Sequence, residues 1–75
     1  MNIDKAIDEV IREYAMACAN HKTFNSAHEG YAVLLEEMDE LKAEIWKKKE
    51  NRDMDKMRCE AVQVGAMALR FLTDI

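Results

Sequence analysis

Apolar residues recur every three or four positions along most of the chain, a spacing that predicts amphipathic helices. The first helix is expected over about 3–20, the second over about 27–49 and the third over about 54–73. The stripe of the first helix comprises Ile3, Ile7, Val10, Ile11, Tyr14, Ala17 and Cys18. The stripe of the second comprises Leu34, Met38, Leu41 and Ile45, which we expect to be buried. The pattern predicts an all-α fold, with one three-helix domain over residues 1–75.

Helix boundaries follow from capping residues and from a polar break. Ser26 and Glu29 have the S-x-x-E spacing of a capping box, and Asp53 is a favourable N-cap for the third helix. The polar stretch 49–53 predicts a turn, so the second and third helices should form an antiparallel hairpin. The lysines at 47–49 would lie at the C-terminal end of the second helix, where positive charge is favourable.

The third predicted helix is apolar around almost its whole circumference. Its apolar residues are Val62, Val64, Ala66, Ala68, Leu69, Phe71 and Leu72. A helix of this kind must be buried on most sides, and two partner helices cannot cover it. We therefore predict a helical-bundle homodimer or homotetramer with this helix at its centre. Ala61, Gly65 and Ala68 form a face of small residues that would allow another helix to approach closely.

Composition excludes several classes of protein. The 75 residues carry a net charge of −4, which disfavours a nucleic-acid polymer as partner because such binders need a basic face. No apolar run approaches the roughly 20 residues of a membrane span, and the amphipathic, acidic stretch 1–10 is unlike a signal peptide. We expect a cytoplasmic protein. Cys18 and Cys59 lie among apolar residues and should be buried thiols.

Acidic side chains flank the predicted turn at matched distances. Glu36, Glu37 and Glu40 precede it, and Glu60 and Gln63 follow it. In an antiparallel hairpin turning at 49–53, Glu40 lies level with Glu60, and Glu37 level with Gln63. Carboxylates that converge at one height form an oxygen-rich site suited to Mg²⁺, with Mn²⁺ as an alternative. This arrangement favours phosphate chemistry over a purely structural bundle.

The alternative is that these acids form ordinary surface ion pairs. The pairs would join Glu40, Glu44 or Glu60 to Lys42, Lys56 or Arg58. Two features argue against this alternative. Glu60 interrupts an otherwise apolar helix, and the matched distances from the turn are not expected by chance.

The E-E-x-x-E run and the later E-x-x-Q run resemble the signature of the MazG-like superfamily, the all-α nucleoside triphosphate pyrophosphohydrolases. The stretch 24–75 is most similar to small MazG-like proteins often found in phages and prophages. The resemblance implies that Glu37, Glu40 and Glu60 hold Mg²⁺, with Gln63 where the family has an aspartate. It also implies hydrolysis between the α and β phosphates of a nucleotide, which gives a monophosphate and pyrophosphate.

Further roles follow from the same resemblance. Glu36 or Glu37 would orient the attacking water, and the basic side chains of Lys22, Lys42 and Arg70 would hold the distal phosphates. The remaining predicted substrate-binding residues are Phe24, Asn25 and His28. For His28 a solvent-facing loop position is the alternative, and for Phe24 a hydrophobic lid over the helix ends. Because Gln63 lacks a charge, a non-catalytic nucleotide-binding, metal-binding or protein-interaction module remains the alternative function.

Overall fold

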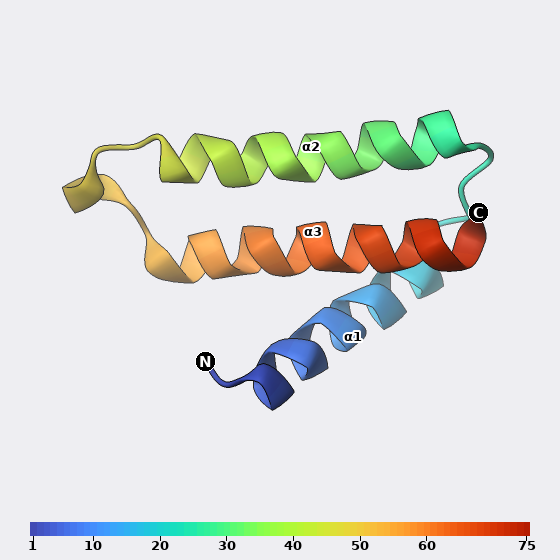
Figure 1. Cartoon of the computed structure of the whole chain (residues 1–75), viewed down its shortest axis with the longest axis horizontal. Helices are drawn as coiled ribbons and strands as arrows, with labels where there is room; N and C mark the ends of the chain where they lie inside the picture. The colour runs from blue at the N-terminus through green and yellow to red at the C-terminus, as the bar shows by residue number, and fades with distance from the viewer.

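The computed structural model describes all residues 1–75 as three α-helices and one short 3₁₀ turn, with no strand. The elements are α1 (Ile3–Asn20), α2 (Ala27–Ile45), η1 (Lys49–Asn51) and α3 (Met54–Asp74). The helices α2 and α3 lie side by side and antiparallel, and α1 crosses the other side of α3 (Figure 1). Because α1 and α2 each pack against α3 and not against each other, α3 is the central helix of the chain. None of the three helices has the length and apolar content needed to cross a membrane.

The predicted caps begin the helices. The Ser26 hydroxyl accepts a hydrogen bond from the Glu29 N–H at 3.1 Å. The Asp53 carboxylate accepts the N–H of Lys56 at 3.1 Å, which satisfies one of the open donors of α3. In a complete capping box the Glu29 carboxylate would also accept the Ser26 N–H. Here it accepts the Asn25 N–H instead, at 3.1 Å. Glu29 therefore also holds the preceding loop against α2.

The helix α2 ends at Ile45, so the prediction that it reaches residue 49 was wrong. The Lys48 backbone is extended, with φ −56° and ψ 143°, and the chain then enters η1. The three consecutive lysines at 47–49 give the helix no apolar side chain to bury. Arg52 reaches back across the turn and donates from Nε to the Ile45 carbonyl at 2.9 Å. This hydrogen bond satisfies one free carbonyl at the C-terminal end of α2. Lysines 47–49 lie beyond the helix.

The core is small and lies where the second half of α3 meets α1 and the loop before α2. Its buried apolar residues are Ala17, Phe24, Ala66 and Met67. Tyr14, Val33, Leu34 and Phe71 pack against them. Only 7 of 75 residues are buried, and Met38, expected in the buried stripe of α2, is 46% exposed. The stripe of α1 is also partly uncovered, since Ile3, Ile7 and Ile11 are exposed.

Two glycines set how closely the helices approach α3. A Cβ atom at Gly30 would lie 2.7 Å from the Phe71 ring, so the absence of a side chain lets α2 pack directly on it. A Cβ atom at Gly65 would lie 3.2 Å from Val10 of α1. The small-residue face predicted on α3 is thus used in part within the chain, by α1.

Both cysteines are exposed, so the prediction of buried thiols was wrong. Cys18 follows the buried Ala17 and lies about 100° further round α1, which turns it away from α3. Cys59 lines an open groove between α1 and the start of α3. Apolar neighbours in sequence did not imply burial, because the helices cover only one side of each other.

Candidate functional site

Three carboxylates from two helices meet at one place. Glu37 and Glu40 are three residues apart and share a face of α2, and the antiparallel pairing brings Glu60 of α3 to the same height. One carboxylate oxygen from each lies within 4.8 Å of the others. Mg²⁺ binds oxygens at about 2.0–2.1 Å, so its opposite ligands are about 4.2 Å apart. Small side-chain movements or bridging waters would therefore let these three residues hold a divalent cation.

Two of the three acids, Glu37 and Glu60, have a raised pKa. Burial is the main cause that raises the pKa of Glu37 to about 7, and the charge and hydrogen bond of Glu40 add to it, with smaller effects from Glu60 and Glu36. Burial also raises the pKa of Glu60, followed by the hydrogen bond and charge of Glu40, while Lys56 opposes the shift. Without a cation Glu37 is therefore about half protonated near neutral pH. A divalent cation would displace the protons and relieve the repulsion.

Surface ion pairs do not account for the cluster. The ion pairs of the chain are Lys47–Glu44 at 3.0 Å, Arg58–Asp55 at 3.7 Å and Arg70–Asp74 at 4.0 Å. None involves Glu37, Glu40 or Glu60. Of the acids in the alternative interpretation, only Glu44 is paired, and its partner is a lysine beyond the end of α2. The converging acids thus lack the direct ion pairs that the alternative requires.

Glu44 adds a fourth carboxylate next to the cluster. Its side chain is 1% exposed, although the alternative interpretation treats it as a surface residue. Its Oε1 accepts a hydrogen bond from Lys47 Nζ at 3.1 Å. Its Oε2 lies 3.0 Å from the same nitrogen but accepts no hydrogen bond of good geometry. The negative charge of Glu44 contributes to the raised pKa of Glu60, so Glu44 extends the acidic region toward the turn.

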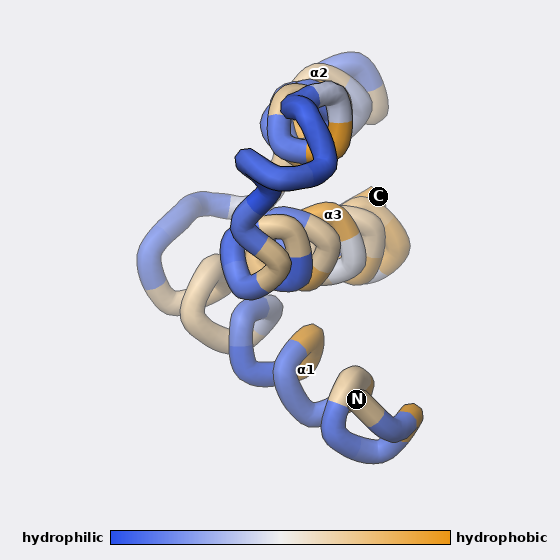
Figure 2. Tube along the Cα trace, turned by 90° about the vertical axis from the view of Figure 1, so that its left-hand side faces the viewer, coloured by the Kyte–Doolittle hydropathy of each residue, from blue (hydrophilic) through white to orange (hydrophobic).

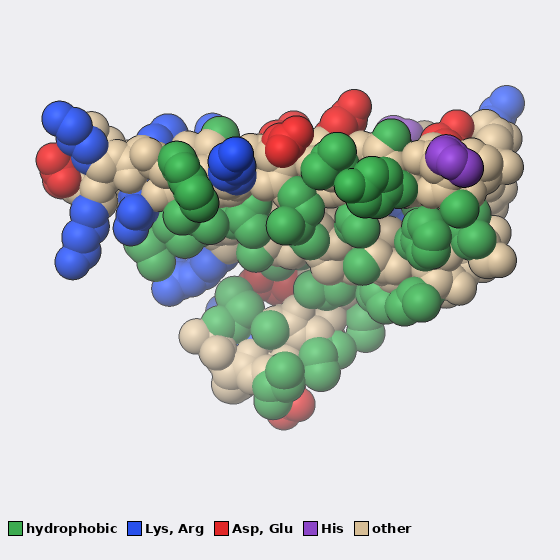
Figure 3. Space-filling view, turned by 45° about the horizontal axis from the view of Figure 1, so that its top comes forward, with side chains coloured by type: hydrophobic (Ala, Val, Ile, Leu, Met, Phe, Trp, Pro, Cys, Tyr) green, Lys and Arg blue, Asp and Glu red, His purple; other side chains and the backbone are tan.

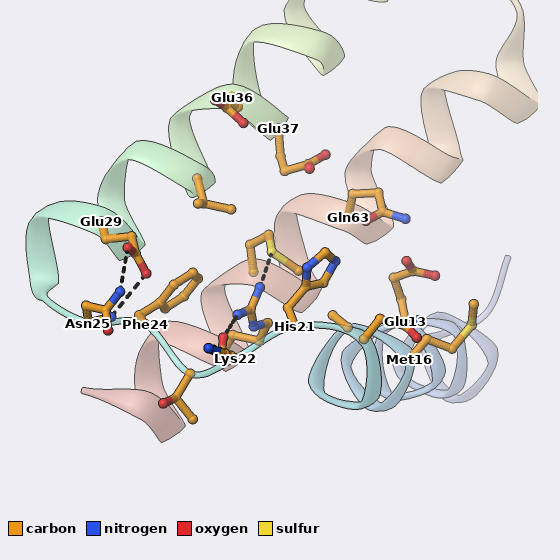
Figure 4. Close-up of a pocket in the computed structure, with 16 residues that line it drawn as sticks. Glu13, Met16, His21, Lys22, Phe24, Asn25, Glu29, Glu36, Glu37 and Gln63 are labelled. Atoms are coloured by element: carbon orange, nitrogen blue, oxygen red, sulfur yellow. Dashed lines mark hydrogen bonds between the residues drawn. The ribbon is translucent and has the colours of Figure 1, made fainter.

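A cavity of about 520 Å³ opens beside the acids, between the loop before α2 and all three helices (Figure 4). Its volume lies in the range of about 300–1,000 Å³ that is usual for small-molecule sites. Glu36 and Glu37 line it from α2, and Gln63 lines it from α3. Gln63 therefore lies across from Glu37, at the position that the hairpin register predicted.

Four of the six predicted substrate-binding residues line this cavity: Lys22, Phe24, Asn25 and Arg70. The other two do not. His28 lies in an apolar groove between α2 and α3 that shares no residue with the cavity. The Lys42 ammonium lies 5.6 Å from the centre of the Trp46 ring, on the outer surface of α2. The structure thus brings the three loop residues and Arg70 of α3 together at the cavity. The two residues of α2 lie outside it.

Arg70 has partners within the chain on every side of its guanidinium. It is 5% exposed, and it lies over the Phe24 ring at 4.2 Å. Nη2 donates to the Lys22 carbonyl at 2.9 Å, Nη1 donates to the Met67 sulfur at 3.6 Å, and Nε lies 4.0 Å from the Asp74 carboxylate. These contacts fasten the loop to α3. Lys22, exposed at the cavity, takes part in no ion pair and is the better placed of the two for an anionic ligand.

Other residues at the cavity had no assigned role. Glu13 and Met16 reach it from α1, and His21 reaches it from the start of the loop (Figure 4). The signal for Glu13 is its place one helical turn before Ala17, which packs in the core. His21 follows the last turn of α1, and that position brings it to the cavity while His28 is carried away on α2.

Comparison with known proteins adds no further assignment. No protein-family model matches the chain, and no curated protein or solved structure is significantly similar to it.

Proposed function

We propose that this protein is a Mg²⁺-dependent nucleotide pyrophosphohydrolase that cleaves NTPs or dNTPs to a monophosphate and pyrophosphate. The observation that carries the proposal is the convergence of Glu37, Glu40 and Glu60, whose carboxylate oxygens lie within 4.8 Å of one another. The resemblance of the two acidic runs to those of the MazG-like superfamily supports it. The cavity beside the acids gives a nucleotide a place to bind, and Mn²⁺ remains an alternative to Mg²⁺.

Some residues would bind the cation, and Glu37 or Glu36 would orient the attacking water. Glu37, Glu40, Glu60 and the Gln63 amide oxygen would hold the cation. When bound, the cation would neutralise phosphate oxygens and the charge that develops on them. Glu37, which lines the cavity, would orient the attacking water through its second carboxylate oxygen. Glu36, exposed at the cavity beside it, is the alternative residue for orienting that water.

The reaction is a displacement at phosphorus. The water oxygen forms a bond to the α phosphorus, and its proton passes to the carboxylate. The bond from that phosphorus to the bridging oxygen breaks, and pyrophosphate leaves. In this arrangement the Lys22 ammonium would lie near the distal phosphates, and the base would lie beside Phe24 and Asn25, where the loop borders the cavity.

We place this activity in a homodimer or homotetramer. The support is the exposure of many large apolar side chains, among them Leu72 at 76% and Ile3 at 72%. Side chains of this size rarely cover the surface of a small monomer in such number.

A direct test measures pyrophosphate release from a panel of canonical and modified NTPs and dNTPs in the presence of Mg²⁺. Glu40→Gln/Glu60→Gln is the inactive reference, and Asp39→Asn, an exposed residue of the same helix, is the matched control. The proposal predicts release by the wild type and the control only. Release no greater than that of the reference variant would exclude catalysis.

The alternative function, a binding module without turnover, is favoured by one residue. Gln63 faces the cavity where the family carries an aspartate, and its amide supplies an oxygen without negative charge. This alternative predicts calorimetric binding of nucleotide or Mg²⁺ with no product. Multiple turnovers would rule it out.

A further inference from the structure

The side of the molecule away from the acidic cavity carries many exposed large apolar side chains, with a few basic and histidine side chains among them (Figure 3). Its exposed apolar side chains, named here the apolar face, are Ile7, Ile11, Tyr31, Leu35, Met38 and Leu72. Hydrophobic side chains gather over α2, α3 and α1 on this side (Figure 3), and a view along the hairpin shows hydrophobic stretches of all three helices turned the same way (Figure 2). Two apolar grooves flank α3 here, and neither shares a residue with the acidic cavity.

The helix pattern separates the two sides. On α2, Tyr31, Leu35 and Met38 follow one stripe with spacings of four and three residues. Glu37 lies about 100° away from Met38 around the helix. One helix therefore presents acids to the cavity and apolar side chains to the opposite side at the same height.

The chain exposes more surface than a compact monomer of its size. Its accessible surface is 5647 Å², whereas a monomer of 8.7 kDa is expected to expose about 4,700 Å². The excess of about 900 Å² is close to the area of about 800 Å² that each partner buries in a standard interface. The radius of gyration agrees, because it is 13.1 Å where a compact domain of this length has about 11.3 Å.

A second copy of the chain fits this face better than a different partner does. In a two-fold dimer the residues near the axis meet their own copies, so a charged residue there would face the same charge. The exposed strip of α3 between the two grooves carries Ala61 and Leu72, which are uncharged and face themselves without penalty. The grooves on either side of this strip can receive the apolar side chains of the partner's α1 and α2. The excess accessible surface of about 900 Å² is also close to what one partner buries in a single interface.

We propose that two copies pair through the apolar face, with the axis near α3, and that the acidic cavities remain open on the outside of the dimer. This inference names the surface for the assembly part of the proposed function. It does not depend on catalysis or on a bound cation. Each protomer then carries a complete set of acids, and α3 gains the cover that neither α1 nor α2 gives it.

Sedimentation velocity over a wide concentration range, without nucleotide or cation, tests the proposal. The wild type should sediment as a dimer. Ile7→Lys/Leu35→Lys should raise the dissociation constant of the dimer by about a hundredfold or more, because each lysine ammonium must be desolvated in the interface. Ala19→Lys/Ala43→Lys adds the same charge at exposed positions of the same helices, about 120° from Ile7 and about 80° from Leu35, and should leave the dimer intact. A wild type that is monomeric throughout, or equal loss in both variants, would overturn the proposal.

A second measurement covers the case in which the double variant fails to fold. A single cysteine at position 35, in a Cys18→Ser/Cys59→Ser background, should be alkylated more slowly as the protein concentration rises. A single cysteine at position 43 should show no such protection. Equal alkylation rates at position 35 at all concentrations would place the interface elsewhere, whatever the outcome for pyrophosphate release.

Discussion

Divalent cation binding should tighten as pH rises from 6 to 8, because the cation must displace protons from the acidic cluster. Glu37, with a pKa of about 7, is about nine-tenths protonated at pH 6 and about one-tenth protonated at pH 8. If only the ionised form binds, the dissociation constant for Mg²⁺ should be about tenfold weaker at pH 6 than at pH 8. The pKa of Glu60 is raised as well, first by burial and then by its hydrogen bond with Glu40.

The stability of the cation-free protein should show the opposite trend. The folded state raises the pKa of Glu37 above its usual value of 4.5, so the folded chain holds this proton more tightly than the unfolded chain. The resulting stabilisation is present below about pH 4.5 and is lost as pH rises through about 7. The melting temperature without cation should therefore fall between pH 5 and pH 8. Saturating Mg²⁺ should therefore raise the melting temperature more at pH 8 than at pH 6.

Isothermal titration with Mg²⁺ at pH 6, 7 and 8 measures the first trend, and thermal unfolding in the same buffers measures the second. Glu37→Gln keeps an oxygen at the site but removes the titrating group, so binding should be weaker and most of its pH dependence should disappear. Asp39→Asn removes an exposed carboxylate outside the cluster and should leave both trends unchanged. Equal affinities at pH 6 and pH 8 for the wild type would refute the reasoning.

Three further substitutions test the packing and the site. Gly30→Ala should destabilise the fold by about 1–2 kcal/mol in urea unfolding, because a clash with Phe71 outweighs the gain in helix propensity, while Gly65→Ala has more room and should change stability less. Glu40→Gln should raise the stability of the cation-free protein by about 1 kcal/mol, since it removes a charge between two acids, and should abolish stabilisation by Mg²⁺; a lower melting temperature without Mg²⁺ would contradict this. Gln63→Asp should tighten Mg²⁺ binding by about tenfold in calorimetry, because a fourth carboxylate joins the site, and unchanged affinity would exclude residue 63 as a ligand.

The helices could be predicted from the sequence where local physics decides them. Periodicity located all three, and Ser26 and Asp53 marked where α2 and α3 begin. The end of α2 was placed too late because lysine has a favourable helix propensity and no breaking residue stands at Ile45. Starts were easier to predict than the end of α2 because a cap is a specific hydrogen bond.

The meeting of the acids could also be predicted, because distance from a turn fixes the register of a hairpin. Burial could not be predicted in the same way. Whether Cys18 is covered depends on the side from which α1 crosses α3, and Glu44 is buried by neighbours that are distant in sequence. The same applies to His21 and His28, since both flank one loop but only the first reaches the cavity.

The small core limits the stability of the fold, and both the acids and the exposed apolar face affect that stability. A domain with 7 buried residues has little stability to spare, yet it buries Glu44 beside acids that already repel one another. Removing charge repulsion and covering apolar surface are therefore the two routes by which this fold can gain stability. The first acts at the acidic cavity and the second on the opposite side, so a cation and a second copy can bind without competing. Their stabilising effects should add, because the two surfaces share no residue.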